Sequence, residues 1–175
     1  NIWIISGGRA EYFLLENLLS ELKKIDKFRL RLVLTGSHFS RKFGNTYNQI
    51  STKVITKEIK TPIISDTREK TLIYMGNLMK KFSKEMIKSK PNLIIIVGDR
   101  YEIFVAAQCA MILKIPIAHV HGGEITEGAF DDTIRHAITK LSHIHFVSTE
   151  EYQKRVIQLG EMPKNIFNVG SLGVQ

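Results

Sequence analysis

Seven short apolar runs, separated by longer segments of helical period, constrain the fold of this chain more than any other feature. The runs are Ile2–Ile5, Leu30–Thr35, Val54–Glu58, Leu93–Val97, Ile117–Val120, Ile144–Val147 and Ile166–Val169. Several are apolar at nearly every position, which is typical of strands covered on both faces, as in a parallel sheet. Alternation of strands and helices with right-handed crossovers predicts a doubly wound, Rossmann-like parallel α/β sheet.

The segments between the runs carry the marks of amphipathic helices. Tyr12–Ile25 places its leucines at i, i+3/i+4 spacing, which forms one apolar face. Two further helices should each begin with a capping box, in which a polar side chain and a glutamate three residues later satisfy free N–H groups. The pairs are Asp66 with Glu69, before a helix over Thr67–Ser89, and Ser148 with Glu151, before a helix over Thr149–Leu159.

The length of 175 residues accommodates one well-buried domain. No apolar run approaches the ~20 residues that a membrane span needs, and a single cysteine, Cys109, excludes an internal disulfide framework. The cytoplasm is therefore the expected compartment. Because the chain stops directly after its last apolar run, we expect residues 1–175 to be a single domain from which a second domain is missing.

The formal net charge of +8 is compatible with nucleic-acid binding. The lysines, however, are spread along the predicted helices rather than massed beside aromatic residues, and no helix-turn-helix, zinc or RNA-binding signature is present. We therefore expect no nucleic acid and no membrane as partners. The charge is interpreted as solvated helix faces, together with a positive cleft that suits an anionic ligand.

Polar residues follow the ends of the predicted strands, where an open α/β sheet binds its ligands. After the first strand, Gly8 and Arg9 allow backbone N–H groups and a cation to approach a phosphate at a helix N-terminus. A simple tight turn explains these residues equally well. His38, after the second strand, either contacts substrate or bonds within its own loop. Asp99, beside Arg100 after the fourth strand, is either a general base or a helix N-cap.

The densest cluster of polar groups follows the fifth strand. It comprises His119, His121, Glu124, Asp131, Asp132, Arg135 and His136. Asp131 and Asp132 would also complement a helix dipole, and the histidines lack the spacing of a zinc site, so no metal is expected. Carboxylates crowded in one crevice raise one another's pKa, which lets one act as base and another as acid.

Six motifs, in order along essentially the whole chain, resemble those of the hydrolysing UDP-N-acetylglucosamine 2-epimerases. The motifs are Ser6-Gly7-Gly8-Arg9-Ala10-Glu11, Thr35-Gly36-Ser37-His38, Gly98-Asp99-Arg100-Tyr101-Glu102, His121-Gly122-Gly123-Glu124, Asp131-Asp132 with Arg135-His136 and His143, and Val169-Gly170-Ser171-Leu172-Gly173. The pattern is most similar to the bacterial sialic-acid branch and to the epimerase half of the bifunctional animal enzyme.

The resemblance implies the first domain of a glycosyltransferase-B-like, two-domain enzyme. The implied reaction removes the C2 proton, expels UDP from C1 by anti elimination and adds water, giving N-acetylmannosamine and UDP without nicotinamide or an obligatory metal. The uridine-binding residues would lie in the second domain, so the isolated chain should be inactive. A homodimer is also implied.

Residue roles follow from the same resemblance. Asp99 and Asp131 would be acid/base residues, supported by Asp132 and Glu124. Some relatives have a catalytic glutamate where this chain has His121, so either His121 or Glu124 takes that role. Substrate contacts are expected from Gly8, Arg9, His38, Arg100, Arg135 and His136.

Three alternatives remain open from the sequence. Relatives with the His-Gly-Gly-Glu pattern include enzymes that act on UDP-2,4-diacetamido-2,4,6-trideoxyglucose in legionaminic-acid synthesis. A glycosyltransferase of the same two-domain architecture would share the fold without needing clustered carboxylates. A non-catalytic nucleotide- or sugar-binding module would have no activity to lose on substitution of Asp99.

Overall fold

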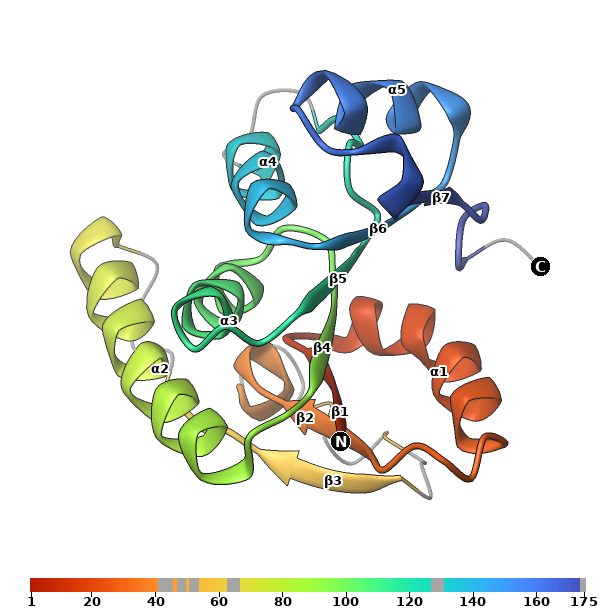
Figure 1. Ribbon diagram of the computed structural model, residues 1–175. Coiled ribbons are helices and arrows are strands. Elements are labelled where there is room, and N and C mark those ends of the chain that lie inside the picture. The colour runs from red at the N-terminus through yellow and green to blue at the C-terminus, as the bar shows by residue number, and fades with distance from the viewer. Residues whose placement is uncertain (41–45, 47–49, 51–53, 63–66, 127–130, 174–175) are drawn as a thin grey trace.

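The structure is a computed structural model that describes residues 1–40, 46, 50, 54–62, 67–126 and 131–173. Within these residues, seven parallel strands form one sheet in the order β3-β2-β1-β4-β5-β6-β7 (Figure 1). The strands are β1 (Ile2–Ser6), β2 (Leu30–Leu34), β3 (Ile55–Glu58), β4 (Leu93–Val97), β5 (Ile117–Val120), β6 (Ile144–Val147) and β7 (Ile166–Asn168). The predicted doubly wound parallel sheet is confirmed, and each apolar run lies on one strand.

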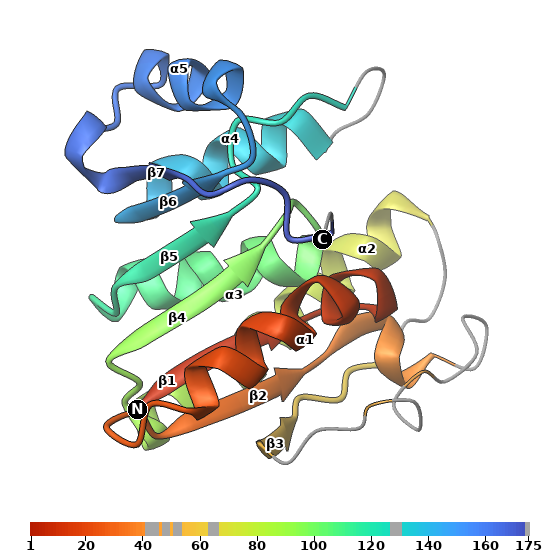
Figure 2. The same ribbon diagram turned by 90° about the vertical axis from the view of Figure 1, so that its right-hand side faces the viewer.

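Helices cover both faces of the sheet. They are α1 (Arg9–Lys23), α2 (Arg68–Ser89), α3 (Tyr101–Ile112), α4 (Asp131–Leu141) and α5 (Glu150–Gln158). Figure 1 shows α2, α3 and α4 on one side of the sheet and α1 on the other. Figure 2, turned by 90°, shows α1 lying in front of strands that all point the same way. None of the described helices is long and apolar enough to cross a membrane.

The side chains of β1 explain why its run is apolar without interruption. Trp3 and Ile5 pack into the core under α2 and α3, where they meet Phe82. Ile4 points to the opposite face and packs with Leu15 of α1. Because both faces are buried, Ile2–Ile5 are all apolar. The polar residue of the strand is Ser6 at its carboxyl end, where its hydroxyl donates to the Gly8 carbonyl.

Both expected capping boxes are wrong by one residue. The α2 cap is Thr67, whose hydroxyl accepts from the Lys70 N–H at 3.4 Å, while Asp66 lies outside the described residues. The α5 cap is Thr149, which accepts from the Tyr152 N–H at 3.2 Å. In each case the extended residue beside the first helical turn is a threonine, which performs the same function as its predicted neighbour.

The strand order reverses at β1, which lies between β2 and β4. The chain leaves β1 into α1 on one face of the sheet and leaves β4 into α3 on the other. Loops that diverge in this way open a crevice at the carboxyl ends of the two strands, which is the usual ligand site of open α/β sheets.

Candidate active site

Three adjoining hollows, formed by residues that the structure describes, open at the carboxyl ends of β1, β4 and β5. Their volumes are about 270, 300 and 400 Å³, and Arg100 lines all three. The largest has Glu11, Asp99, His121 and Glu124 in its wall. We call the three hollows together the crevice. It brings residues from the ends of three different strands to one place, as the sequence predicted.

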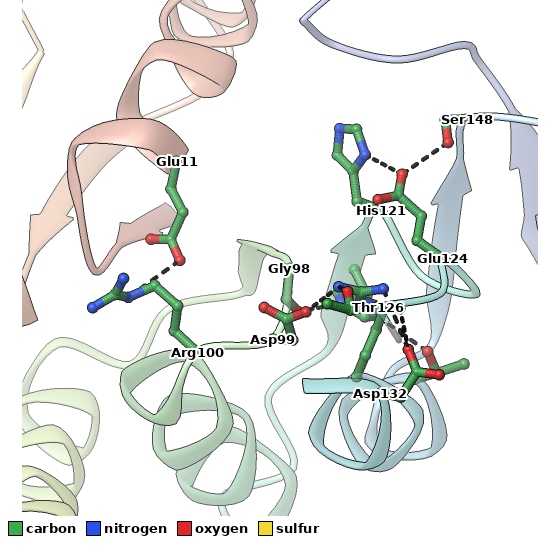
Figure 3. A network of polar contacts seen from close by, with 12 residues as sticks. Glu11, Gly98, Asp99, Arg100, His121, Glu124, Thr126, Asp132 and Ser148 are labelled. Carbon is green, nitrogen blue, oxygen red and sulfur yellow. Dashed lines mark hydrogen bonds and ion pairs between the residues drawn. The ribbon is translucent and has the colours of Figure 1, made fainter. Parts of the chain in front are cut away.

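His121 is held in the crevice by the carboxylate of Glu124. Its Nδ1 lies 2.5 Å from Glu124 Oε1, and the Ser148 hydroxyl donates to the same oxygen at 2.8 Å (Figure 3). The other ring nitrogen, Nε2, is buried without a hydrogen-bond partner in the described part of the chain. Burial alone would raise the pKa of Glu124, but the hydrogen bonds from His121 and Ser148 together hold that pKa below its usual value.

The backbone at His121 adopts the left-handed conformation, with φ of +63°. A residue with a Cβ pays about 1–2 kcal/mol for this conformation, so the surrounding structure must impose it. The turn carries the ring into the crevice directly after β5. Ser148, which completes the arrangement, was not predicted as a site residue, although its place directly after β6 was a signal for it.

Asp99 forms an ion pair with Arg135 of α4, an almost fully buried side chain whose Nη2 also donates to Thr126 at 3.0 Å. Burial raises the pKa of Asp99 above its usual value; Arg135 opposes the shift and Asp131 adds to it. The alternative in which Asp99 caps a helix is excluded, because Arg100 occupies the N-cap position of α3. Asp99 is therefore a crevice residue whose orientation Arg135 sets.

The two aspartates that begin α4 have different surroundings. Asp131 shares a hollow with Asp99 and Arg100, so it faces the crevice. Asp132 lines none of the three hollows; its Oδ1 accepts from the Thr126 N–H at 2.8 Å and lies 3.7 Å from Arg135 Nη1. Asp132 therefore positions Thr126 and Arg135 and does not itself line the crevice (Figure 3).

Glu11 is a crevice residue that was missing from the predicted site. Its Oε2 accepts a 2.5 Å hydrogen bond from the Gly7 N–H, and its Oε1 lies 3.8 Å from Arg100 Nε. The glycine-rich loop was expected to offer its amides to a phosphate, but the Gly7 amide is already bound to this carboxyl. The signal was present in the sequence: Glu11 stands in the first turn of the helix after β1, where an anion is stabilised.

The expected substrate-contact residues separate into three groups. Gly8, Arg9 and Arg100 line the hollow of about 270 Å³, with the Arg9 guanidinium 5.4 Å from the centre of the Phe13 ring. Arg135 is buried beneath Asp99, and His136 lines none of the three hollows. Arg135 therefore supports a crevice residue, whereas His136 lies outside the crevice.

His38 is placed differently from the prediction that it contacts substrate. The side chain is fully buried, and its ring nitrogens bond Ser6 at 2.9 Å and Thr46 at 3.0 Å. Burial lowers the pKa of His38 to about 4, so the ring is neutral. It joins the loops after β1 and β2, which agrees with the alternative of a bond within the loops.

His119, the first histidine of the predicted cluster, lies on β5 and is also structural. His119 Nε2 lies 2.8 Å from the Gly98 carbonyl and Nδ1 lies 3.3 Å from the Thr139 hydroxyl, so both nitrogens have protein partners. Burial lowers its pKa to about 3. Among the described residues, no group of three or more potential metal ligands is assembled.

Known proteins resemble this chain over almost all of its length. The family described as UDP-N-acetylglucosamine 2-epimerase matches residues 20–175. A GDP/UDP-N,N'-diacetylbacillosamine 2-epimerase (hydrolyzing) of Campylobacter jejuni is 43% identical over 98% of this chain and 45% of that protein. Polysialic acid biosynthesis protein P7 of Escherichia coli is 40% identical over 99% of this chain and 45% of that protein.

A solved structure extends the likeness to the fold. UDP-GlcNAc 2-epimerase from Neisseria meningitidis, bound to UDP-GlcNAc, superposes with a TM-score of 0.80 at 19% identity, covering 97% of this chain and 46% of that one. The chain thus spans a little under half the length of its relatives and has the fold of the first half of these glycosyltransferase-B-like proteins. On the family match and the 40–43% identities, this chain belongs to the UDP-N-acetylglucosamine 2-epimerase family.

Proposed function

We propose that this chain is the first domain of a hydrolysing UDP-sugar 2-epimerase, which converts UDP-N-acetylglucosamine and water into N-acetylmannosamine and UDP. One observation carries the proposal: the neighbouring strands β4 and β5 deliver Asp99 and His121 to a single crevice beside Arg100. Two groups able to exchange protons and one fixed cation are what an elimination from an anionic substrate requires.

The chemistry divides between these groups. One takes the proton from C2 as the C1–O bond to UDP breaks, which leaves a C1=C2 double bond. Water then adds its oxygen at C1. C2 receives a proton on the face opposite to the one from which its proton was removed, which inverts the configuration at C2. His121 Nε2 is free to exchange a proton because Glu124 holds Nδ1. Asp99, with its raised pKa and with Asp131 beside it, is suited to the complementary transfer.

Other residues of the site support this reaction. Glu124, Asp132 and Arg135 act through the residues that they position, and Arg100 attracts the leaving diphosphate together with Arg9 and Gly8. The reaction involves no net oxidation, so it needs no nicotinamide. We further propose that the uridine contacts lie in a second domain, and that residues 1–175 alone are therefore inactive.

A second substrate is favoured by one specific observation. The 43% identical relative is named for a diacetylated bacillosamine sugar, and the sialic-acid and diacetamido branches share the same elimination and hydration. The substituents at C4 and C6 distinguish the two substrates, and both would leave the roles of Asp99 and His121 unchanged.

A homodimer in the cytoplasm completes the proposal. The single cysteine is unpaired, which agrees with a reducing compartment.

On α2, Leu72, Ile73 and Ile87 are more than half exposed, and a Cβ on Gly76 between them would meet nothing within 4 Å of the described atoms. This face suits a second copy. Loss of the dimer in sedimentation after Leu72→Asp with Ile87→Asp would support the assignment; an unchanged dimer would contradict it.

The deciding experiment uses the two-domain protein in deuterated water. The protein is incubated with UDP-N-acetylglucosamine, and products are followed by proton NMR. UDP and N-acetylmannosamine with deuterium at C2 would establish the proposed reaction. Turnover of the diacetamido analogue alone would select the second substrate. A glycoside product would indicate a glycosyltransferase, and inertness toward both sugars would overturn the proposal.

A further inference from the structure

Glu11 is a buried carboxyl with one oxygen bound and one oxygen left over. Its side chain is 9% exposed, and Oε2 accepts from the Gly7 N–H. Oε1 has no hydrogen-bond donor among the described residues, since Arg100 Nε lies 3.8 Å away. Glu11 lines both the 270 Å³ and the 400 Å³ hollows, so the buried, unpaired oxygen belongs to a residue of the crevice wall.

The charges around Glu11 do not balance if every carboxyl is ionised. Glu102, whose side chain is 4% exposed, lies closer to the single guanidinium, at 3.4 Å from Arg100 Nε. Glu102 also accepts from the Tyr74 hydroxyl at 3.0 Å. Two buried carboxyls therefore share one cation, and the better-bound one is Glu102. Under these conditions one of the pair retains its proton.

The other titratable groups near Glu11 do not change this ratio of two carboxyls to one guanidinium. The charged side chains that act on Glu11 from the described elements are Arg100 and Glu102 at the start of α3. Tyr74 of α2 bonds Glu102, and Arg9 lines the 270 Å³ hollow with Glu11. Asp99, His121 and Glu124 line the 400 Å³ hollow with it. Burial raises the pKa of Glu11 to about 8, against the opposing effects of Arg100 and the Gly7 amide. Arg9 is exposed to solvent, where its charge is screened.

We propose that Glu11 binds the ligand of this crevice as a neutral carboxylic acid: Oε1–H donates a hydrogen bond to a phosphoryl oxygen of a nucleoside diphosphate, while Oε2 accepts from Gly7. The ligand class rests on the proposed function. In this form Glu11 adds a donor beside Arg100 without adding a negative charge that would repel the phosphate. Figure 3 shows the Glu11 carboxyl directed toward Arg100, the cation with which it would share the anion.

The consequence is a proton requirement for binding. Below pH 8 the donor is already in place. Above it, the ligand must bind an ionised Glu11 or restore its proton, so affinity falls by about tenfold per pH unit for one linked proton. Glu11→Gln keeps a donor and an acceptor in the same positions and has no proton to lose. Glu16→Gln, at an exposed position of α1, makes the same chemical change outside the crevice.

The test measures UDP binding to the two-domain protein by isothermal titration calorimetry from pH 7.5 to 9.5, in pairs of buffers with different ionisation enthalpies. We expect wild type and Glu16→Gln to lose affinity above pH 8 and to take up close to one proton per UDP there. Glu11→Gln should bind with nearly constant affinity and no proton uptake. Glu11→Ala, which lacks the donor, should bind about tenfold or more weakly at pH 7.5.

Three outcomes would overturn the proposal. Wild type could bind UDP without proton uptake above pH 8, a result that needs no variant and holds even if Glu11→Gln fails to fold. Glu11→Gln could show the wild-type pH dependence, or Glu11→Ala the wild-type affinity. If sugar turnover persists in any of these cases, the role of Glu11 is wrong and the epimerase function stands. If the folded protein binds no UDP at all, both the role of Glu11 and the proposed epimerase function are wrong.

Discussion

The ring of His121 and the hydroxyl of Ser148 meet at one oxygen of Glu124, with Nδ1 2.5 Å and Oγ 2.8 Å from Oε1. This shared oxygen joins the ends of β5 and β6. A carboxylate that accepts from Nδ1–H leaves Nε2 as the nitrogen without a proton, and it stabilises the ring when Nε2 gains one. The arrangement thereby selects the tautomer in which Nε2, the ring nitrogen without a partner among the described residues, carries no proton.

Replacing Glu124 tests whether this arrangement serves catalysis. Glu124→Gln keeps the size of the side chain but removes the charge that stabilises a protonated His121. We expect kcat of the two-domain protein to fall by about 100-fold, with KM changed by less than about threefold. Ser148→Ala should have a smaller effect in the same direction. A kcat within twofold of wild type for Glu124→Gln would contradict the proposed role of His121.

Replacing Arg135 tests the buried ion pair beneath the crevice. Arg135→Ala leaves Asp99 buried without its cation, so the free energy of unfolding should fall by about 3–5 kcal/mol. The matched control is Lys140→Ala, which breaks the 2.5 Å pair with Glu161 at a half-exposed side chain and should cost about 1 kcal/mol or less. Urea denaturation measures both. Equal losses would mean that Asp99 finds another partner or is not held by Arg135.

The stability of the protein against pH reports the protonation of Glu11 without any ligand. A carboxyl with a pKa raised from 4.5 to about 8 contributes stability that is complete below pH 4.5 and is lost as pH rises through 8. Relative to wild type, Glu11→Gln should therefore become more stable across this window, by up to about 1.4 kcal/mol per pH unit. Glu16→Gln should run parallel to wild type. A difference that stays constant with pH would show that Glu11 ionises normally.

Two glycines that follow the neighbouring strands β4 and β5 allow the cost of backbone strain to be distinguished from the cost of steric overlap. Gly98 and Gly123 have φ of +72° and +77°, but only at Gly123 would a Cβ meet a neighbouring atom, the Tyr152 carbonyl oxygen at 2.6 Å. Gly98→Ala should cost about 1–2 kcal/mol for the backbone alone. Gly123→Ala should cost clearly more, measured as the shift in thermal midpoint. Equal shifts would mean that α5 moves aside without cost.

The fold was readable from the sequence because its strands are buried on both faces. The consecutive apolar residues Trp3, Ile4 and Ile5 fill both faces of β1, so the run stands out against the amphipathic helices that follow. The topology then placed Asp99 and His121 on one crevice, since the carboxyl ends of neighbouring parallel strands meet at one edge. Cap positions were less certain, because Thr67 and Thr149 each stand beside a residue with the same capping ability.

The details of the site were not readable, because they depend on which way single side chains turn. His38 follows a strand end just as Asp99 does, yet its ring turns inward to Ser6 and Thr46. Glu11 was not among the predicted site residues, and its burial beside Arg100 and Glu102 is what distinguishes it. Spacing along the chain carries no information about such neighbours, which come from segments far apart in the sequence.

Because the backbone at His121 is left-handed, the residue that would be most stable at this position differs from the residue that the proposed activity needs. Glycine adopts φ of +63° without the cost that histidine incurs, so the fold and the proposed chemistry favour different residues there. Selection for heat resistance alone would accept glycine or asparagine at this turn and lose the imidazole. A histidine that persists under such selection would be evidence that turnover, rather than folding, maintains it.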